Sequence, residues 1–218
     1  MKGIRTYLSI YPIIYKVIVL IIVPLASLGI AVYLGLTVPA TKNGNTLIAL
    51  FTMSGIGVYS EIFGEMFSIG NICAKKRPFG DFVVSSPLMK TFVKRFAVTD
   101  ALRRVVWYPV LCIIAQIPVF IIRGSEADFF GALVIGLATG AALNLGVIIY
   151  RNSPFAVILV FVYLATGVCW SLLAIPYTFA TSNVMRYVFA LITVLVCALT
   201  SFLSARSVIK HSEGDQYD

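Results

Sequence analysis

The sequence predicts an all-α integral membrane protein that crosses the bilayer six times, with both ends of the chain in the cytoplasm. Its 218 residues are 60% hydrophobic and only 12% charged, and the mean hydropathy is +0.96. A soluble domain of this length could not keep so much apolar surface away from water, because its surface is large relative to its volume. A bilayer is itself an apolar solvent, so we expect one transmembrane domain that covers residues 1–218.

Six apolar stretches supply the expected spans. They cover residues 17–38, 46–72, 105–122, 129–150, 155–177 and 184–203. At about 1.5 Å per residue, each is long enough to cross a hydrocarbon core of about 30 Å. Pro24 lies inside the first stretch and predicts a kink in that span.

The basic residues predict the orientation. Fourteen of the 17 Lys and Arg residues precede the first span, lie between spans two and three or four and five, or follow the sixth. Only Lys42, Arg123 and Arg186 fall on the other side. Because basic residues gather on the cytoplasmic side, we expect both termini there, in a multi-pass protein of the cell membrane. This asymmetry also accounts for the net charge of +8, so no nucleic-acid partner is needed to explain it.

Three segments lie outside the expected spans. Residues 1–16 combine tyrosines and isoleucines with Lys2 and Arg5, which is typical of a helix that lies in the lipid interface. Residues 204–218 are expected to form a cytoplasmic tail. Residues 73–104 form a long basic segment between spans two and three.

The segment 73–104 contains the pattern of an amphipathic helix. Ser86 is a suitable N-cap and Pro87 suits the first helical position. The expected apolar face and the basic residues beside it are Leu88, Phe92 and Phe96, and Lys90, Lys94 and Arg95. Such a helix can lie on membrane lipid, or it can dock on a soluble partner. We favour docking on a partner, and the lipid interpretation stays open.

Span two contains two carboxylates. Glu61 and Glu65 lie one turn apart, and Ser68 follows on the same side of the helix. A carboxylate inside a membrane is costly, so it should face a cavity or a neighbouring helix. One hypothesis is that these three residues line a translocation path. The alternative is a packing face, in which Gly57 and Gly64 let another helix approach and the glutamates reach the headgroups.

Span four contains Gly136 and Gly140 in a Gly-x-x-x-Gly pattern, which is typical of close helix packing within a bundle or between subunits. No zinc-protease, hydrolase-elbow or Walker motif occurs in the sequence. We therefore expect no catalytic, cofactor-binding or metal-binding residues and no enzyme activity in this chain.

The stretch 82–94, Phe-Val-Val-Ser-Ser-Pro-Leu-Met-Lys-Thr-Phe-Val-Lys, resembles the cytoplasmic loop of ABC-2 type permease subunits, in which a Ser-Leu-Pro-like turn opens a basic helix between spans two and three. Here Ser85, Ser86 and Pro87 stand at that turn. The six-span layout and the short outer loops also resemble this family.

The resemblance implies an exporter half. Two permease subunits, identical or related, would form the path, and two separate cytoplasmic ATP-binding subunits would dock on the loop helices. A small peptide, a drug or another amphipathic molecule is the expected substrate. The alternatives are a proton-coupled secondary transporter that uses Glu61 and Glu65, and a membrane immunity or scaffold protein that transports nothing.

Overall fold

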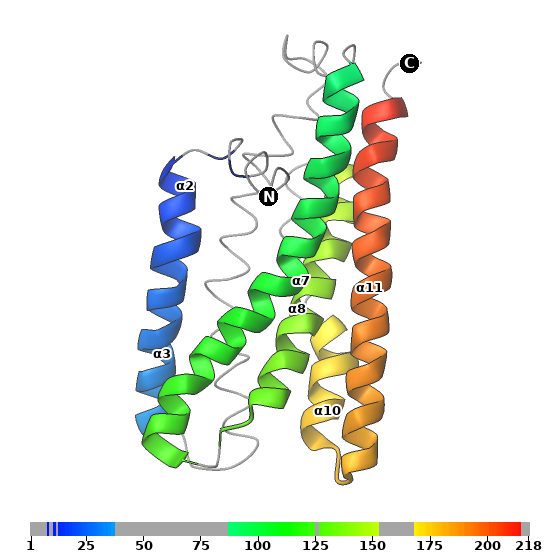
Figure 1. Cartoon of the computed structure of the whole chain (residues 1–218). Coiled ribbons are helices and arrows are strands. Elements are labelled where there is room, and N and C mark those ends of the chain that lie inside the picture. Colours follow the sequence, from blue (N-terminus) through cyan, green and yellow to red (C-terminus); the bar gives the residue numbers. More distant parts are fainter. Residues whose placement is uncertain are drawn as a thin grey trace.

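The computed structural model describes Leu8, Tyr11 and residues 13–37, 87–124, 127–152 and 168–214. Within these residues every regular element is helical (Figure 1). In chain order the elements are α2 (Ile13–Val17), η1 (Ile18–Ile22), α3 (Val23–Thr37), α7 (Pro87–Arg123), α8 (Phe129–Asn152), η4 (Trp170–Ala174), α10 (Ile175–Phe179) and α11 (Asn183–Gly214). The prediction of an all-helical chain is thus confirmed for the described part.

Four helical stretches are long and apolar enough to cross a membrane. They are Ile13–Tyr33, Thr91–Ile122, Phe129–Gly146 and Asn183–Lys210. They correspond to the first, third, fourth and sixth expected spans. The second expected span, 46–72, lies outside the described residues, as does the first part of the fifth. The molecule is therefore a helical membrane protein with at least these four candidate spans.

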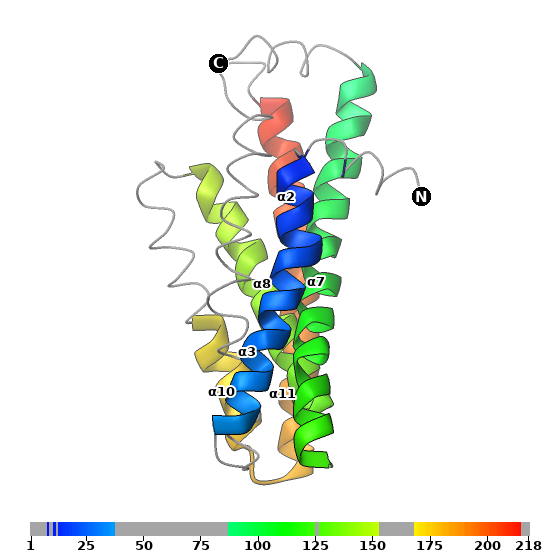
Figure 2. The same cartoon turned by 90° about the vertical axis from the view of Figure 1, so that its left-hand side faces the viewer.

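The four long stretches lie side by side along one axis (Figures 1 and 2). Helix α2 begins at one end of the bundle. Helix α7 also begins at this end, and helices α8 and α11 end there. We call this the basic end, because Lys94, Arg95, Arg206 and Lys210 lie toward it. At this end α7 and α11 extend beyond α2 and α8 in both views.

The surface and the interior of the bundle have the polarity expected in lipid. Large apolar side chains such as Leu191 and Phe202 are about 60% exposed, at 61% and 62%. In contrast, Arg104, Gln116 and Asn144 are at most 1% exposed. Apolar surface toward the solvent and polar groups toward the interior are stable only where the solvent is itself apolar.

The elements α7 and α8 make the closest helix contact. A Cβ atom added to Gly136 would lie 2.4 Å from the Cα of Pro109, and one added to Gly140 would lie 3.0 Å from the carbonyl oxygen of Arg104. No larger side chain fits at Gly136 without a shift of the α7 backbone. The two glycines of the Gly-x-x-x-Gly pattern thus allow the backbone of α8 to lie directly against α7.

Two wide helical turns precede prolines. The π-helical turn η1 ends two residues before Pro24, and η4 ends two residues before Pro176. In each, an N–H bonds to the carbonyl five residues earlier: Val23 to Ile18, and Ile175 to Trp170. A proline ring collides with the carbonyl of the preceding turn, and a widened turn gives it room.

Two helices are longer than the sequence predicted. Helix α7 runs without a break from Pro87 through the third span to Arg123, although the sequence placed a boundary at residue 104. Helix α11 continues to Gly214, although a tail was expected from residue 204. The two extensions pack on one another through Val93 and Val208, each 2% exposed, and this contact stabilises both as helix.

Candidate functional site

A chain of hydrogen bonds crosses three helices inside the bundle. On α7, the guanidinium of Arg104 pairs with the carboxylate of Asp100 one turn earlier. The same guanidinium donates to the Asn144 side-chain oxygen of α8 at 3.1 Å. The Asn144 amide in turn donates to the Ser201 hydroxyl of α11 at 2.9 Å, and that hydroxyl donates to the Cys197 carbonyl at 2.6 Å. We call these four side chains, Asp100, Arg104, Asn144 and Ser201, the polar bridge.

The polar bridge is almost completely enclosed. Arg104 and Asn144 are 0% exposed, and Asp100 is 1% exposed. Arg103 also lies near Asp100, with a nitrogen–oxygen distance of 3.6 Å. An ionisable group inside a membrane protein is expensive to bury, so it is retained where it pairs and where it has a role. The buried ion pair of Asp100 and Arg104 is therefore the strongest candidate for a functional element among the described residues.

The depth of the bridge follows from helix geometry. Arg104 lies 19 residues from the end of α7 at Arg123, which is about 28 Å at 1.5 Å per residue. Asn144 lies 15 residues from the start of α8 at Phe129, or about 22 Å. A hydrocarbon core is about 30 Å thick, so the bridge lies in the part of the span nearer the basic end.

Local packing explains why the bridge can form here. Gly140 lies against the Arg104 backbone, and it is one helical turn before Asn144 on the same face of α8. Because α8 approaches α7 so closely, the short Asn144 side chain reaches the guanidinium directly. Thus the glycine pattern of α8 also positions the polar bridge.

Beyond the bridge, α7 and α11 form a projecting pair that we call the stalk, comprising residues 87–99 of α7 and 205–214 of α11. Its core contains Val93, Ala97 and Val208, with Phe92, Ala205 and Ile209 packed against them. Lys94 and Arg95 are exposed on α7, and Arg206 and Lys210 are exposed on α11. The stalk therefore has an apolar seam and a basic surface.

The structure divides the residues predicted to couple to a partner. Ser86 lies outside the described residues, and Pro87, Leu88 and Lys90 belong to the first turn of α7. Lys94 and Arg95 are exposed, whereas Phe92 is half-buried against the α11 part of the stalk.

Phe96 does not lie on the exposed face of the stalk. It is 1% exposed and packs with Tyr11, Tyr15 and Val19 at the start of the first span. The rings of Tyr11 and Tyr15 are stacked with their centroids 4.5 Å apart. Tyr11 and Tyr15, in the N-terminal segment expected at the lipid interface, therefore bury a surface against α7.

The residues predicted to line a path, Glu61, Glu65 and Ser68, lie outside the described residues, as do Gly57 and Gly64. The polar bridge as a whole was not predicted from the sequence, and Arg104 was counted among the cytoplasmic basic residues. A signal was present, because Asp100 and Arg104 are spaced i, i+4 within α7. Asn144, as an asparagine in span four, can also hydrogen-bond across helices, whereas nothing local predicts Ser201 as its partner.

No family model, curated protein or solved structure matches this chain.

Proposed function

We propose that this chain is the transmembrane permease subunit of an ABC-type exporter. In this proposal two such subunits, identical or related, form the path, and separate cytoplasmic ATP-binding subunits drive it. The substrate is a small peptide, a drug or another amphipathic molecule. The helical membrane fold and the loop sequence 82–94 support the proposal, and the stalk is the observation that carries it.

The direction of the helices supports six spans with both termini in the cytoplasm. Helices α3 and α7 both run away from the basic end, so Thr37 and Pro87, the end of one and the start of the other, lie at opposite ends of the bundle. Helices α8 and α11 both run toward the basic end, and α10 ends at the opposite end beside the start of α11. The basic residues gathered at one end agree with a cytoplasmic location for that end.

The length of α7 supports a docking surface outside the membrane. Its 37 residues extend over about 55 Å, which exceeds a hydrocarbon core of about 30 Å. The excess lies at the basic end, where Lys94 and Arg95 are exposed. A soluble partner with an acidic groove could bind this surface, and the charges would guide its approach.

The continuity of α7 supplies a route for motion. One uninterrupted helix carries both the exposed Lys94 and Arg95 and the buried Arg104 of the polar bridge. A rigid helix moves as a unit, so a tilt imposed at the stalk would also displace the guanidinium. Because Asn144 and Ser201 belong to other helices, that displacement would change how α7 is held against α8 and α11.

The test is co-purification from the cells in which the protein naturally occurs. A tagged parent chain should retain a polypeptide with a Walker nucleotide site and ATP hydrolysis. Lys94→Glu/Arg95→Glu should reduce both at least tenfold, because like charges placed opposite one another cost several kcal/mol. Arg186→Glu, at the opposite end of α11, is the matched control and should retain the partner. Absence of an ATPase with the parent chain, or equal retention by both variants, would refute the proposal.

A further inference from the structure

We propose that a groove between α7 and α11 binds an acyl chain of an anionic phospholipid, whose headgroup lies against Arg95. The groove has a volume of about 440 Å³, which is within the usual range of roughly 300–1,000 Å³ for small-molecule sites. This inference goes beyond the proposed function, since it concerns the isolated chain and needs no ATP-binding partner.

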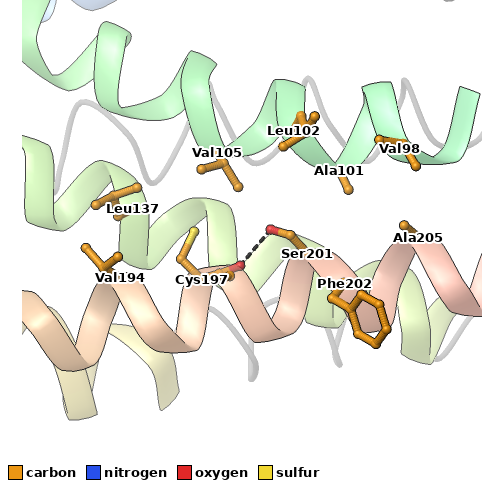
Figure 3. Close-up of a pocket in the computed structure, with 11 residues that line it drawn as sticks. Val98, Ala101, Leu102, Val105, Leu137, Val194, Cys197, Ser201, Phe202 and Ala205 are labelled. Carbon is orange, nitrogen blue, oxygen red and sulfur yellow. Dashed lines mark hydrogen bonds between the residues drawn. The ribbon is translucent and has the colours of Figure 1, made fainter. Parts of the chain in front are cut away.

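The groove runs along the two helices, with one residue of α8 at its floor (Figure 3). Its lining residues are Val98, Ala101, Leu102 and Val105 of α7, Leu137 of α8, and Val194, Cys197, Ala198, Ser201, Phe202 and Ala205 of α11. In Figure 3 Val98, Ala101 and Val105 of α7 face α11 across the space, and Cys197, Ser201 and Ala205 face α7. Phe202 points away from α7. Nearly all of this surface is hydrocarbon.

Ser201 carries the only hydroxyl among these lining residues, and it is already engaged. It donates to the Cys197 carbonyl at 2.6 Å, drawn as a dashed line in Figure 3, and it accepts from Asn144 at 2.9 Å. A polar ligand would therefore lose its hydrogen bonds to water and find few replacements. A hydrocarbon chain has no such cost, so the lining selects an alkyl occupant.

The groove opens toward the lipid-facing side of the bundle. Leu102 is 54% exposed and Phe202 is 62% exposed, and both lie at its edges. In a bilayer these side chains meet acyl chains, which can enter the groove sideways without crossing a polar barrier. The occupant is thus taken from the surrounding lipid.

One arginine flanks the groove toward the basic end. Arg95 precedes Val98 by three residues and Leu102 by seven on α7, so it continues the exposed edge of the groove on that helix. Arg206 follows Leu199 by seven residues on α11, so it lies on a face of α11 that does not line the groove. Both arginines are exposed. A chain in the groove would place its headgroup near Arg95, which favours an anionic lipid over a zwitterionic one.

The test uses the full chain in nanodiscs and a phosphatidylglycerol with a photoactivatable acyl chain. Peptide mapping should locate the label at groove residues such as Leu102 and Phe202. Unlabelled phosphatidylglycerol should compete, and phosphatidylcholine should compete at least tenfold less well. Arg95→Gln should weaken binding about fivefold, which corresponds to about 1 kcal/mol for a cation near the membrane surface. Arg206→Gln, on the face of α11 that does not line the groove, is the matched control and should bind like the parent.

A groove-filling variant gives a second, independent readout. Ala198 is exposed at the groove, so Ala198→Phe should fill it without overpacking the core, and it should abolish the label. Leu199 is the neighbouring residue, is 58% exposed and does not line the groove, so Leu199→Phe is the matched control and should label like the parent.

Three outcomes would overturn the inference. Equal competition by phosphatidylcholine would show bulk lipid contact. Undiminished labelling of Ala198→Phe would show that the label lies outside the groove. A photoreactive residue placed at Leu102 that links two copies of the chain would show that a second copy, and not lipid, covers this face.

Discussion

Helix α7 meets its two long neighbours in different ways. Against α8 it is in backbone contact, since a Cβ atom at Gly136 would overlap the Pro109 backbone and one at Gly140 would lie only 3.0 Å from the Arg104 carbonyl oxygen. Against α11 it is separated by an open groove beside residues 98–105, and the two helices pack on one another in the stalk. The same helix thus has one closed face and one partly open face.

The difference has a simple physical origin. Helix α8 presents glycines where α7 presents the backbone of Pro109 and Arg104, so the two surfaces interlock. Helix α11 presents Cys197, Ala198 and Ser201 opposite Leu102 and Val105, and these small side chains do not fill the space between the axes. A filled interface resists movement, whereas a partly open one can change its packing or accept a ligand. We therefore regard α7–α8 as the fixed contact and α7–α11 as the adjustable one.

The prediction with the largest expected effect concerns whether the polar bridge holds α7 in place within the bundle. Arg104→Leu leaves the buried Asp100 without its main partner, and such a loss typically costs about 3–5 kcal/mol. Arg103, at 3.6 Å from Asp100, should limit the effect to the lower end of that range. The measurement is the free energy of unfolding in mixed micelles. The double variant Asp100→Leu/Arg104→Leu should regain most of the loss, and a double variant no more stable than the single one would contradict this interpretation.

The next prediction compares one substitution at the two interfaces. Gly136→Leu must displace the backbone of Pro109, so it should lower the free energy of unfolding by about 3 kcal/mol, the upper end of typical overpacking costs. Ala198→Leu, in the open groove, should change it by less than about 0.5 kcal/mol. Gly29→Leu is a control for the loss of a glycine, because nothing lies within 4 Å of its added Cβ. Equal losses at Gly136 and Ala198 would remove the distinction between the two interfaces.

A third prediction concerns the residue that joins the two interfaces. Asn144→Leu removes the hydrogen bonds to both Arg104 and Ser201. The buried guanidinium of Arg104 then has one hydrogen-bond acceptor fewer. We expect a loss of about 1–3 kcal/mol in the free energy of unfolding. Thermal unfolding of detergent-solubilised protein provides the comparison, with Asn183→Leu, at an exposed position at the start of α11, as the control. A variant as stable as the parent would show that the bridge does not stabilise the bundle.

The smallest expected effect concerns a residue of α11, the helix at the adjustable contact. Ser201→Ala removes the hydroxyl between Asn144 and the Cys197 carbonyl, and interhelical hydrogen bonds in membranes contribute about 0.6 kcal/mol on average. The loss should therefore be several times smaller than for Arg104→Leu when both are measured in the same micelles. A loss as large as that of Arg104→Leu would mean that α11 is held as firmly as α8.

The class of the protein, and the positions of α8 and α11 along the chain, follow from local sequence patterns. The apolar stretches at 129–150 and 184–203 agree closely with α8 and with most of α11, because hydropathy is a local property of the chain. The helix expected after Pro87 is also present in the structure, since a proline is favoured in the first turn and the following residues need no tertiary contact to favour a helix.

Which residues of those helices are buried depends on tertiary contacts. Arg104 resembles any other cytoplasmic arginine in the sequence, and it is buried because Asn144, 40 residues later, and the backbone space at Gly140 lie beside it. Phe96 belongs to an exposed stripe by its spacing, and it is buried because Tyr11 and Tyr15 pack over it. Burial depends on partners that are distant along the chain, whereas hydropathy and helix signals do not.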